Sequence, residues 1–111
     1  MVESYHFVLK RKFMGYDDVY DAIKRGKKTS EWRDVSDSWI ARLTKMSVEE
    51  FNRFVRAARQ SISLVPKYRR AKFVVGYTKR PMLVADVEQL IYHPNSRQFE
   101  VRIKNVKELS K

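Results

Sequence analysis

Residues 26–33 read Gly26-Lys27-Lys28-Thr29-Ser30-Glu31-Trp32-Arg33 and join an expected helix to an expected strand. Apolar side chains recur at helical spacing in residues 16–25, which predicts an amphipathic helix there. Gly26 stands where that helix would stop, because glycine takes the left-handed conformation of a helix C-terminus at little cost. Residues 29–33 are predicted to form a strand, so this stretch is a helix end, a basic turn and a strand.

The predicted strand places alternate side chains on opposite faces. Glu31 and Arg33 are therefore expected on one side and Trp32 on the other, in the core rather than as a stacking platform. Lys28 lies at the mouth of the strand, where the turn can direct its ammonium toward the same pocket. Three converging charged groups indicate a binding or catalytic pocket. The alternative is an ordinary surface ion pair between Glu31 and Arg33, which stabilises a fold little.

The spacing Gly-x-Lys-x-x-Glu-x-Arg resembles the signature of the ASCH domain and is filled here by Gly26, Lys28, Glu31 and Arg33. Residues 75–88 are similar to the later strands of that family, with a Gly-Tyr turn before a strand that carries a Pro-Met step. ASCH domains belong to the PUA-like superfamily of small β-barrels. The resemblance implies an α+β fold, a PUA-like barrel of about five or six strands with flanking helices. It covers nearly the whole chain, which is expected to be one domain of residues 1–111.

Two helices are expected after the motif strand, as an insertion. Residues 38–46 form the first, and Ser47-Val48-Glu49-Glu50 is a capping-box pattern that opens a second helix running to about residue 61. The apolar stripe predicted to be buried on the second helix consists of Val48, Phe51, Phe54, Val55 and Ala58. The pair is either a basic lid over the pocket or a helical hairpin that covers one end of the barrel.

The other strands are predicted at residues 5–12, at 73–75 and in a hairpin of residues 82–92 and 98–103 that turns at 93–97. Alternation along the last strand places its apolar residues Phe99, Val101 and Ile103 inward. The polar residues Glu100, Arg102 and Lys104 are expected to point outward.

The chain is strongly basic, with 24 Lys and Arg against 13 Asp and Glu, a net charge of +11 and a sequence pI near 10.1. Such an excess on 111 residues predicts a polyanionic partner, nucleic acid first. A solubility charge is the alternative. Basic residues also alternate with aromatic ones around Tyr68 and Tyr77, and single-stranded nucleic acid needs cations for phosphate and ring faces for bases.

Other classes of site and location have less support. With no cysteine, disulfides and Cys-based zinc sites are excluded. His6 and His93 are the two histidines and are expected to be structural, so no metal or cofactor is predicted. No apolar run reaches the roughly 20 residues of a membrane span, and no signal peptide is recognised, so a cytoplasmic protein without a membrane partner is expected.

The function predicted from these features is binding of RNA, another single-stranded nucleic acid or a nucleoside, by a monomer with a basic cleft. The cleft would recognise a nucleotide or modified base with Lys28, Glu31 and Arg33, flanked by Trp39. The residues expected to hold the remaining nucleic acid are Lys67, Tyr68, Arg69, Arg70, Tyr77, Lys79 and Arg80.

A small hydrolase is the second hypothesis, with Lys28 and Glu31 as catalytic acid and base. Some ASCH proteins act on acetylated cytidine with the motif lysine and a threonine three residues later, and others have been associated with RNA cleavage. Here Glu31 stands in place of that threonine, which weakens the parallel. A third hypothesis is a protein-interaction module whose basic face meets an acidic partner.

Overall fold

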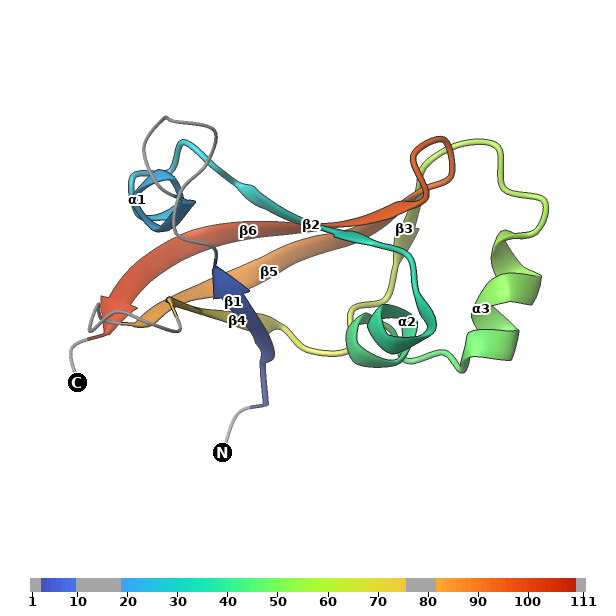
Figure 1. Ribbon diagram of the computed structural model, residues 1–111, viewed down its shortest axis with the longest axis horizontal. Helices are drawn as coiled ribbons and strands as arrows, with labels where there is room; N and C mark the ends of the chain where they lie inside the picture. Colours follow the sequence, from blue (N-terminus) through green and yellow to red (C-terminus); the bar gives the residue numbers. More distant parts are fainter. Residues whose placement is uncertain (1–2, 10–18, 76–81, 110–111) are drawn as a thin grey trace.

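The protein folds around one sheet of six strands that curls into half a barrel, with three helices beside it (Figure 1). The computed structural model describes residues 3–9, 19–75 and 82–109, and these counts refer to them. The strands are β1 (Tyr5–Leu9), β2 (Ser30–Asp34), β3 (Ile62–Leu64), β4 (Arg70–Val75), β5 (Met82–His93) and β6 (Gln98–Leu109). The helices are α1 (Val19–Lys24), α2 (Asp37–Leu43) and α3 (Val48–Val55). The α+β class is confirmed.

The long hairpin of β5 and β6 forms the centre of the sheet. Strands β3 and β4 pair with β5, β2 pairs with β6, and β1 joins in parallel to β4. The pairing of the hairpin shifts register between Val84 and Asp86 and again between Val87 and Gln89, and Asn105 near the first shift has a φ of 54°. An extra residue in one strand of a pair bends the strand and increases its twist. The hairpin therefore curves and gives the sheet an inner and an outer face (Figure 1).

The core lies against the inner face. Phe7 of β1 stacks on Phe73 of β4 with ring centroids 5.4 Å apart, and both side chains are buried. Helix α1 adds Ile23, which is fully buried. The predicted inward orientation is confirmed for the apolar residues of β6, which are Phe99, Val101 and Ile103.

The two expected helices are present after β2, at the end of the molecule near the hairpin turn (Figure 1). The capping box is confirmed: the Glu50 N–H donates to Ser47 Oγ at 3.0 Å and the Ser47 N–H to Glu50 Oε1 at 3.3 Å. Phe51 packs on Tyr92 and Phe99, with centroids 5.3 and 5.4 Å away, so α3 covers this end of the sheet. None of the described helices has the length and apolarity to cross a membrane.

The structure corrects several expected boundaries. Helix α3 ends at Val55 rather than near residue 61, because the chain must turn back to pair Ile62 with Tyr92. Strand β4 begins at Arg70 rather than at residue 73, and β6 extends to Leu109 rather than ending at residue 103. Phe54 was expected in the buried stripe but is 51% exposed, since α3 contacts the sheet through the face that carries Phe51.

We predict that Phe51→Ala lowers the free energy of unfolding by about 3–5 kcal/mol, because it leaves a cavity among buried rings. The matched variant Phe54→Ala, on the exposed side of the same helix, should change it by less than about 0.5 kcal/mol. Urea unfolding followed by circular dichroism measures both. Equal losses in the two variants would contradict this packing of α3.

Candidate nucleic-acid interface

The three charged residues of the motif converge on one carboxylate oxygen. Arg33 Nη1 donates to Glu31 Oε1 at 2.8 Å, and Lys28 Nζ lies 3.4 Å from the same atom. The backbone N–H of Trp32 donates to it at 3.2 Å. Glu31 is 4% exposed, so its charge is compensated by these donors rather than by bulk water. The predicted convergence is therefore present in the structure.

The turn before β2 sets the position of Lys28. Gly26 has a φ of +77°, the left-handed conformation expected for a helix C-terminus. The N–H groups of Lys27 and Lys28 both donate to the Ala22 carbonyl, at 2.9 and 3.0 Å, and close the end of α1. Since Ile103 N–H also donates to the Thr29 carbonyl at 2.9 Å, the turn is tied to β6 as well as to α1.

Arg33 is held by aromatic rings in addition to Glu31. Its Cζ lies 4.9 Å from the centroid of Phe7 and 5.0 Å from that of Trp39, and Arg42 Cζ lies 4.8 Å from Trp39. Each contact of a cation with a ring face is worth about 0.5–2 kcal/mol. The guanidinium therefore has a fixed orientation, and Trp39 flanks the motif as predicted.

A surface cavity of about 260 Å³ adjoins Trp39 and combines cationic with aromatic groups. Lys67 Nζ donates to the Ala41 carbonyl at 3.1 Å and lies 5.8 Å from the Tyr68 centroid. Tyr68 in turn meets the buried Tyr5 edge-on at 5.3 Å. The lining residues are Ser4, Tyr5, His6, Trp39, Ala41, Arg42, Lys67 and Tyr68. The structure thus brings together Trp39, Lys67 and Tyr68 of the predicted set and adds Arg42, which sequence reasoning missed.

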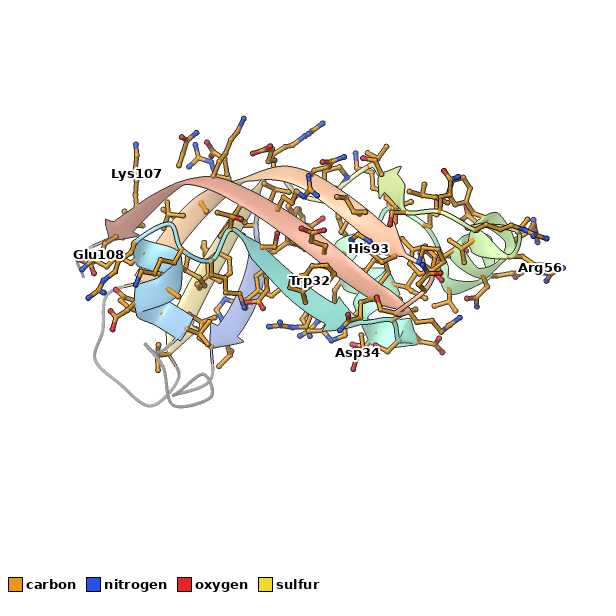
Figure 2. All side chains as sticks on the ribbon, turned by 90° about the horizontal axis from the view of Figure 1, so that it is seen from above. Trp32, Asp34, Arg56, His93, Lys107 and Glu108 are labelled. Carbon is orange, nitrogen blue, oxygen red and sulfur yellow. The ribbon has the colours of Figure 1, made fainter. Side chains whose placement is uncertain are left out.

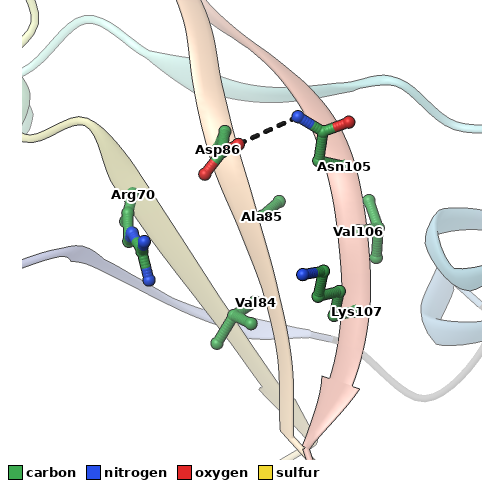
Figure 3. A pocket seen from close by; sticks show the side chains of 7 residues that line it. All are labelled: Arg70, Val84, Ala85, Asp86, Asn105, Val106 and Lys107. Carbon is green, nitrogen blue, oxygen red and sulfur yellow. Dashed lines mark hydrogen bonds between the residues drawn. The ribbon is translucent and has the colours of Figure 1, made fainter.

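The other predicted residues lie elsewhere. Arg69 is exposed, and its carbonyl accepts from the Val87 N–H at 2.8 Å. Arg70 lies on β4 and lines a separate cavity of about 360 Å³ between β4, β5 and β6 (Figure 3). Strand pairing carries it away from the loop that holds Lys67. Tyr77, Lys79 and Arg80 lie outside the described residues.

Sequence reasoning also missed a hydrogen-bonded network on the outer face of the sheet. His93 Nε2 lies 2.8 Å from Glu100 Oε1, and its Nδ1 lies 2.7 Å from Ser61 Oγ. Ser30 Oγ donates to Glu100 Oε2 at 2.5 Å and Arg102 Nε to the same oxygen at 3.1 Å. Glu100 points outward as expected, but it is 6% exposed because these groups cover it.

The prediction that Trp32 lies in the core is wrong, because Trp32 lies on this outer face. It is 40% exposed, and its ring centroid lies 5.0 Å from that of His93 (Figure 2). The register pairs Trp32 with Glu100, the outward residue of β6, whereas Arg33 pairs with the buried Phe99. His93 belongs to β5 rather than to the turn. The side of the sheet on which Trp32 lies follows from this register, and alternation along β2 alone does not determine the register.

The pKa of Glu100 reflects opposing effects. Burial raises the pKa, but the hydrogen bonds from Ser30, His93 and Arg102 outweigh it and hold the pKa below the ordinary value of 4.5.

The described residues contain no group of three or more His, Cys, Asp or Glu side chains arranged to hold a metal ion.

Comparison of the chain with protein-family models, characterised proteins and solved structures gave no significant match. The resemblance to the ASCH domain stands on the motif residues described above and stays a prediction.

We predict that Glu31→Gln lowers the free energy of unfolding by about 1–3 kcal/mol, because it leaves Lys28 and Arg33 without their buried carboxylate. Glu49→Gln removes a similar pair with Arg53, at 3.0 Å but with both side chains exposed, and should change stability little. Thermal unfolding of the two variants at one pH makes the comparison. Equal effects would mean that the motif pair behaves as a surface ion pair.

The lowered pKa of Glu100 predicts a dependence of stability on pH. The ionised carboxylate stabilises the fold above its ordinary pKa of 4.5, and this contribution is lost as the pH falls through the lower folded value. The stability difference between the wild type and Glu100→Gln should be largest near pH 7 and shrink steadily below about pH 4. Urea unfolding at several pH values measures it, and a difference independent of pH would exclude the charged network.

Proposed function

We propose that the protein binds single-stranded nucleic acid, RNA first, and that Lys28, Glu31 and Arg33 form a cleft that holds a nucleotide or modified base. The observation that carries this proposal is the orientation of the Arg33 guanidinium, which contacts Phe7 and Trp39 at the side of their stacked rings. The resemblance of the motif to the ASCH signature and the net charge of +11 support it independently.

The cleft combines the two kinds of group that a nucleotide requires. The fixed guanidinium offers planar donors for a phosphate or a base carbonyl. Among the described residues, Glu31 takes its hydrogen bonds on Oε1, so Oε2 is the atom that would accept from a base amino group. Trp39 supplies a ring beside both.

The adjoining cavity extends the proposed contact beyond one nucleotide. Lys67 and Arg42 would hold phosphates, and Tyr68 would stack on a neighbouring base. Such a mixture supports a nucleic-acid surface over a charge that only keeps a protein in solution, because a solubility charge needs no ring beside each cation.

Hydrolysis remains the second candidate and has less support. A lysine that acts as a base must first lose its proton. Lys28 is ion-paired with Glu31 at 3.4 Å, so this pair would have to separate before either group could transfer a proton. The Lys28–Glu31 ion pair therefore favours binding of a charged ligand over proton transfer.

We predict that the protein binds labelled single-stranded RNA in a fluorescence anisotropy titration and that the logarithm of the affinity falls linearly with that of the salt concentration. Lys67→Gln should reduce the salt slope by about 0.7, the value for one phosphate contact to a single strand. Arg56→Gln, exposed at the end of α3, is the matched control and should leave the slope nearly unchanged.

Arg33→Gln should weaken binding by about tenfold or more, as expected when a charged hydrogen bond of roughly 1.5–3 kcal/mol is lost. Mass spectrometry of the same mixtures, with acetylated cytidine included, detects product. Product that disappears in Lys28→Ala would make the hydrolase the better account. No binding at low salt would overturn the proposed function, and an Arg33→Gln variant that binds as tightly as the wild type would overturn the cleft. Equal losses in Arg56→Gln and Lys67→Gln would overturn the contact in the adjoining cavity.

A further inference from the structure

The outer face of the sheet carries a row of cations that the proposed cleft does not use. Residues paired across antiparallel strands share a face. Trp32 pairs with Glu100, Asp86 with both Arg70 and Lys104, and Val84 with Lys107. Arg102, which donates to Glu100, lies on the same face. We call this set the outer track, and it consists of Trp32, Arg70, Arg102, Lys104 and Lys107.

Trp32 is exposed but held in place. Its ring packs on the imidazole of His93 at an interplanar angle of 31°, and Ser61 and Glu100 fix that imidazole through its two nitrogens. Trp32 and His93 are labelled close to each other in Figure 2. A large ring kept at the surface by its neighbours is the form that stacking platforms for bases take.

The cavity at the opposite end of the track has the composition of a phosphate site. Arg70 and Lys107 lie on either side of β5, with Val84 between them (Figure 3). At one end of the cavity Asn105 Nδ2 donates to Asp86 Oδ2 at 3.0 Å, which occupies one oxygen of this carboxylate and leaves its charge opposed by the two cations. An anion between the two cations would lie over an apolar floor that suits a sugar ring.

The spacing of the two ends suits a short strand of nucleic acid. The partner of Trp32 on β6 is Glu100. Lys107 lies seven positions further along β6, which is about 23 Å of extended chain. Arg102 and Lys104 lie between these positions. The smallest single-stranded sites hold roughly four nucleotides, a length of the same order.

We propose that the outer track is a second binding site for single-stranded RNA, in which Trp32 stacks on a base and Arg70 with Lys107 holds a phosphate. This inference rests on the proposed function and adds a site on the other face of β2. Strand β2 is at the edge of the sheet, with Arg33 on its inner face and Trp32 on its outer face. One RNA strand that passes around this edge would reach both sites.

The two tryptophans of the chain make the two sites separately visible. Trp39→Phe leaves Trp32 as the fluorescent reporter of the outer track, and Trp32→Phe leaves Trp39 as the reporter of the cleft. Each variant is titrated at low salt with oligouridylates of about 3, 6 and 10 nucleotides, lengths that are comparable to the sizes of known single-stranded binding sites. The outer track predicts that Trp32 fluorescence is quenched and that the longer oligomers bind more tightly.

Charge removal tests the phosphate site. The double variant Arg70→Gln/Lys107→Gln should reduce the salt slope by about 1.4, for two phosphate contacts. The control Arg56→Gln/Arg59→Gln removes the same charge from two exposed positions just after the last residue of α3. It should leave the salt slope unchanged. Trp32→Ala should weaken binding about 5- to 100-fold, the loss of one stacked base.

The outcomes separate this inference from the proposed function. Quenching of Trp32, together with a loss of slope in the Arg70/Lys107 variant and not in its control, supports the outer track. Binding that quenches Trp39 but not Trp32, with the same salt slope in both double variants, overturns the outer track and leaves the cleft as the binding site. Quenching of Trp32 alone supports the outer track against the cleft. If the wild type binds no RNA at low salt, both proposals are wrong.

Discussion

The antiparallel pairing of β5 with β6 is the interaction on which the rest of the structure depends. Strands β2, β3 and β4 each pair directly with this hairpin, and β1 is attached through β4. The hairpin pairs across two register shifts, and the resulting bend separates an inner face, where the core collects, from an outer face. Helix α3 packs on the hairpin through Phe51, so the insertion is positioned by the same element.

This arrangement makes the charged motif part of the inner side of the sheet. A buried carboxylate is costly unless donors replace the water around it. Glu31 receives two side-chain cations and a backbone N–H, and Arg33 gains Phe7 and Trp39 as ring partners. The same contacts that compensate the burial of Glu31 also orient the guanidinium. The burial of Glu31 and the orientation of Arg33 therefore depend on the same contacts.

Local patterns in the sequence were sufficient for the features that short-range chemistry decides. Gly26 ends α1, the Ser47 capping box opens α3, and the turn brings Lys28 to Glu31. Each depends on residues a few positions apart. The convergence of Lys28, Glu31 and Arg33 could be predicted for the same reason.

Features set by contacts between distant strands could not be predicted in this way. The position of Trp32 depends on its register with Glu100, and the end of α3 depends on where Ile62 meets Tyr92. The strand was predicted to begin only at residue 73, yet pairing with Asp86 makes Arg70 part of β4. The separation of Arg70 from Lys67 follows from that pairing and not from the composition of the loop.

The register of β2 runs against simple burial of apolar surface, and this is an argument for function. A slip of one residue would turn Trp32 inward and Glu31 outward, which burial alone would favour by about 2 kcal/mol or more. Two hydrogen bonds at the ends of the strand hold the observed register: Ile103 N–H to the Thr29 carbonyl at 2.9 Å and Val35 N–H to the Arg97 carbonyl at 3.0 Å. Proteins break such rules mainly at functional sites. Strand β2 keeps a buried charge on one face and an exposed ring on the other, so both of its faces are candidates for contact with a ligand.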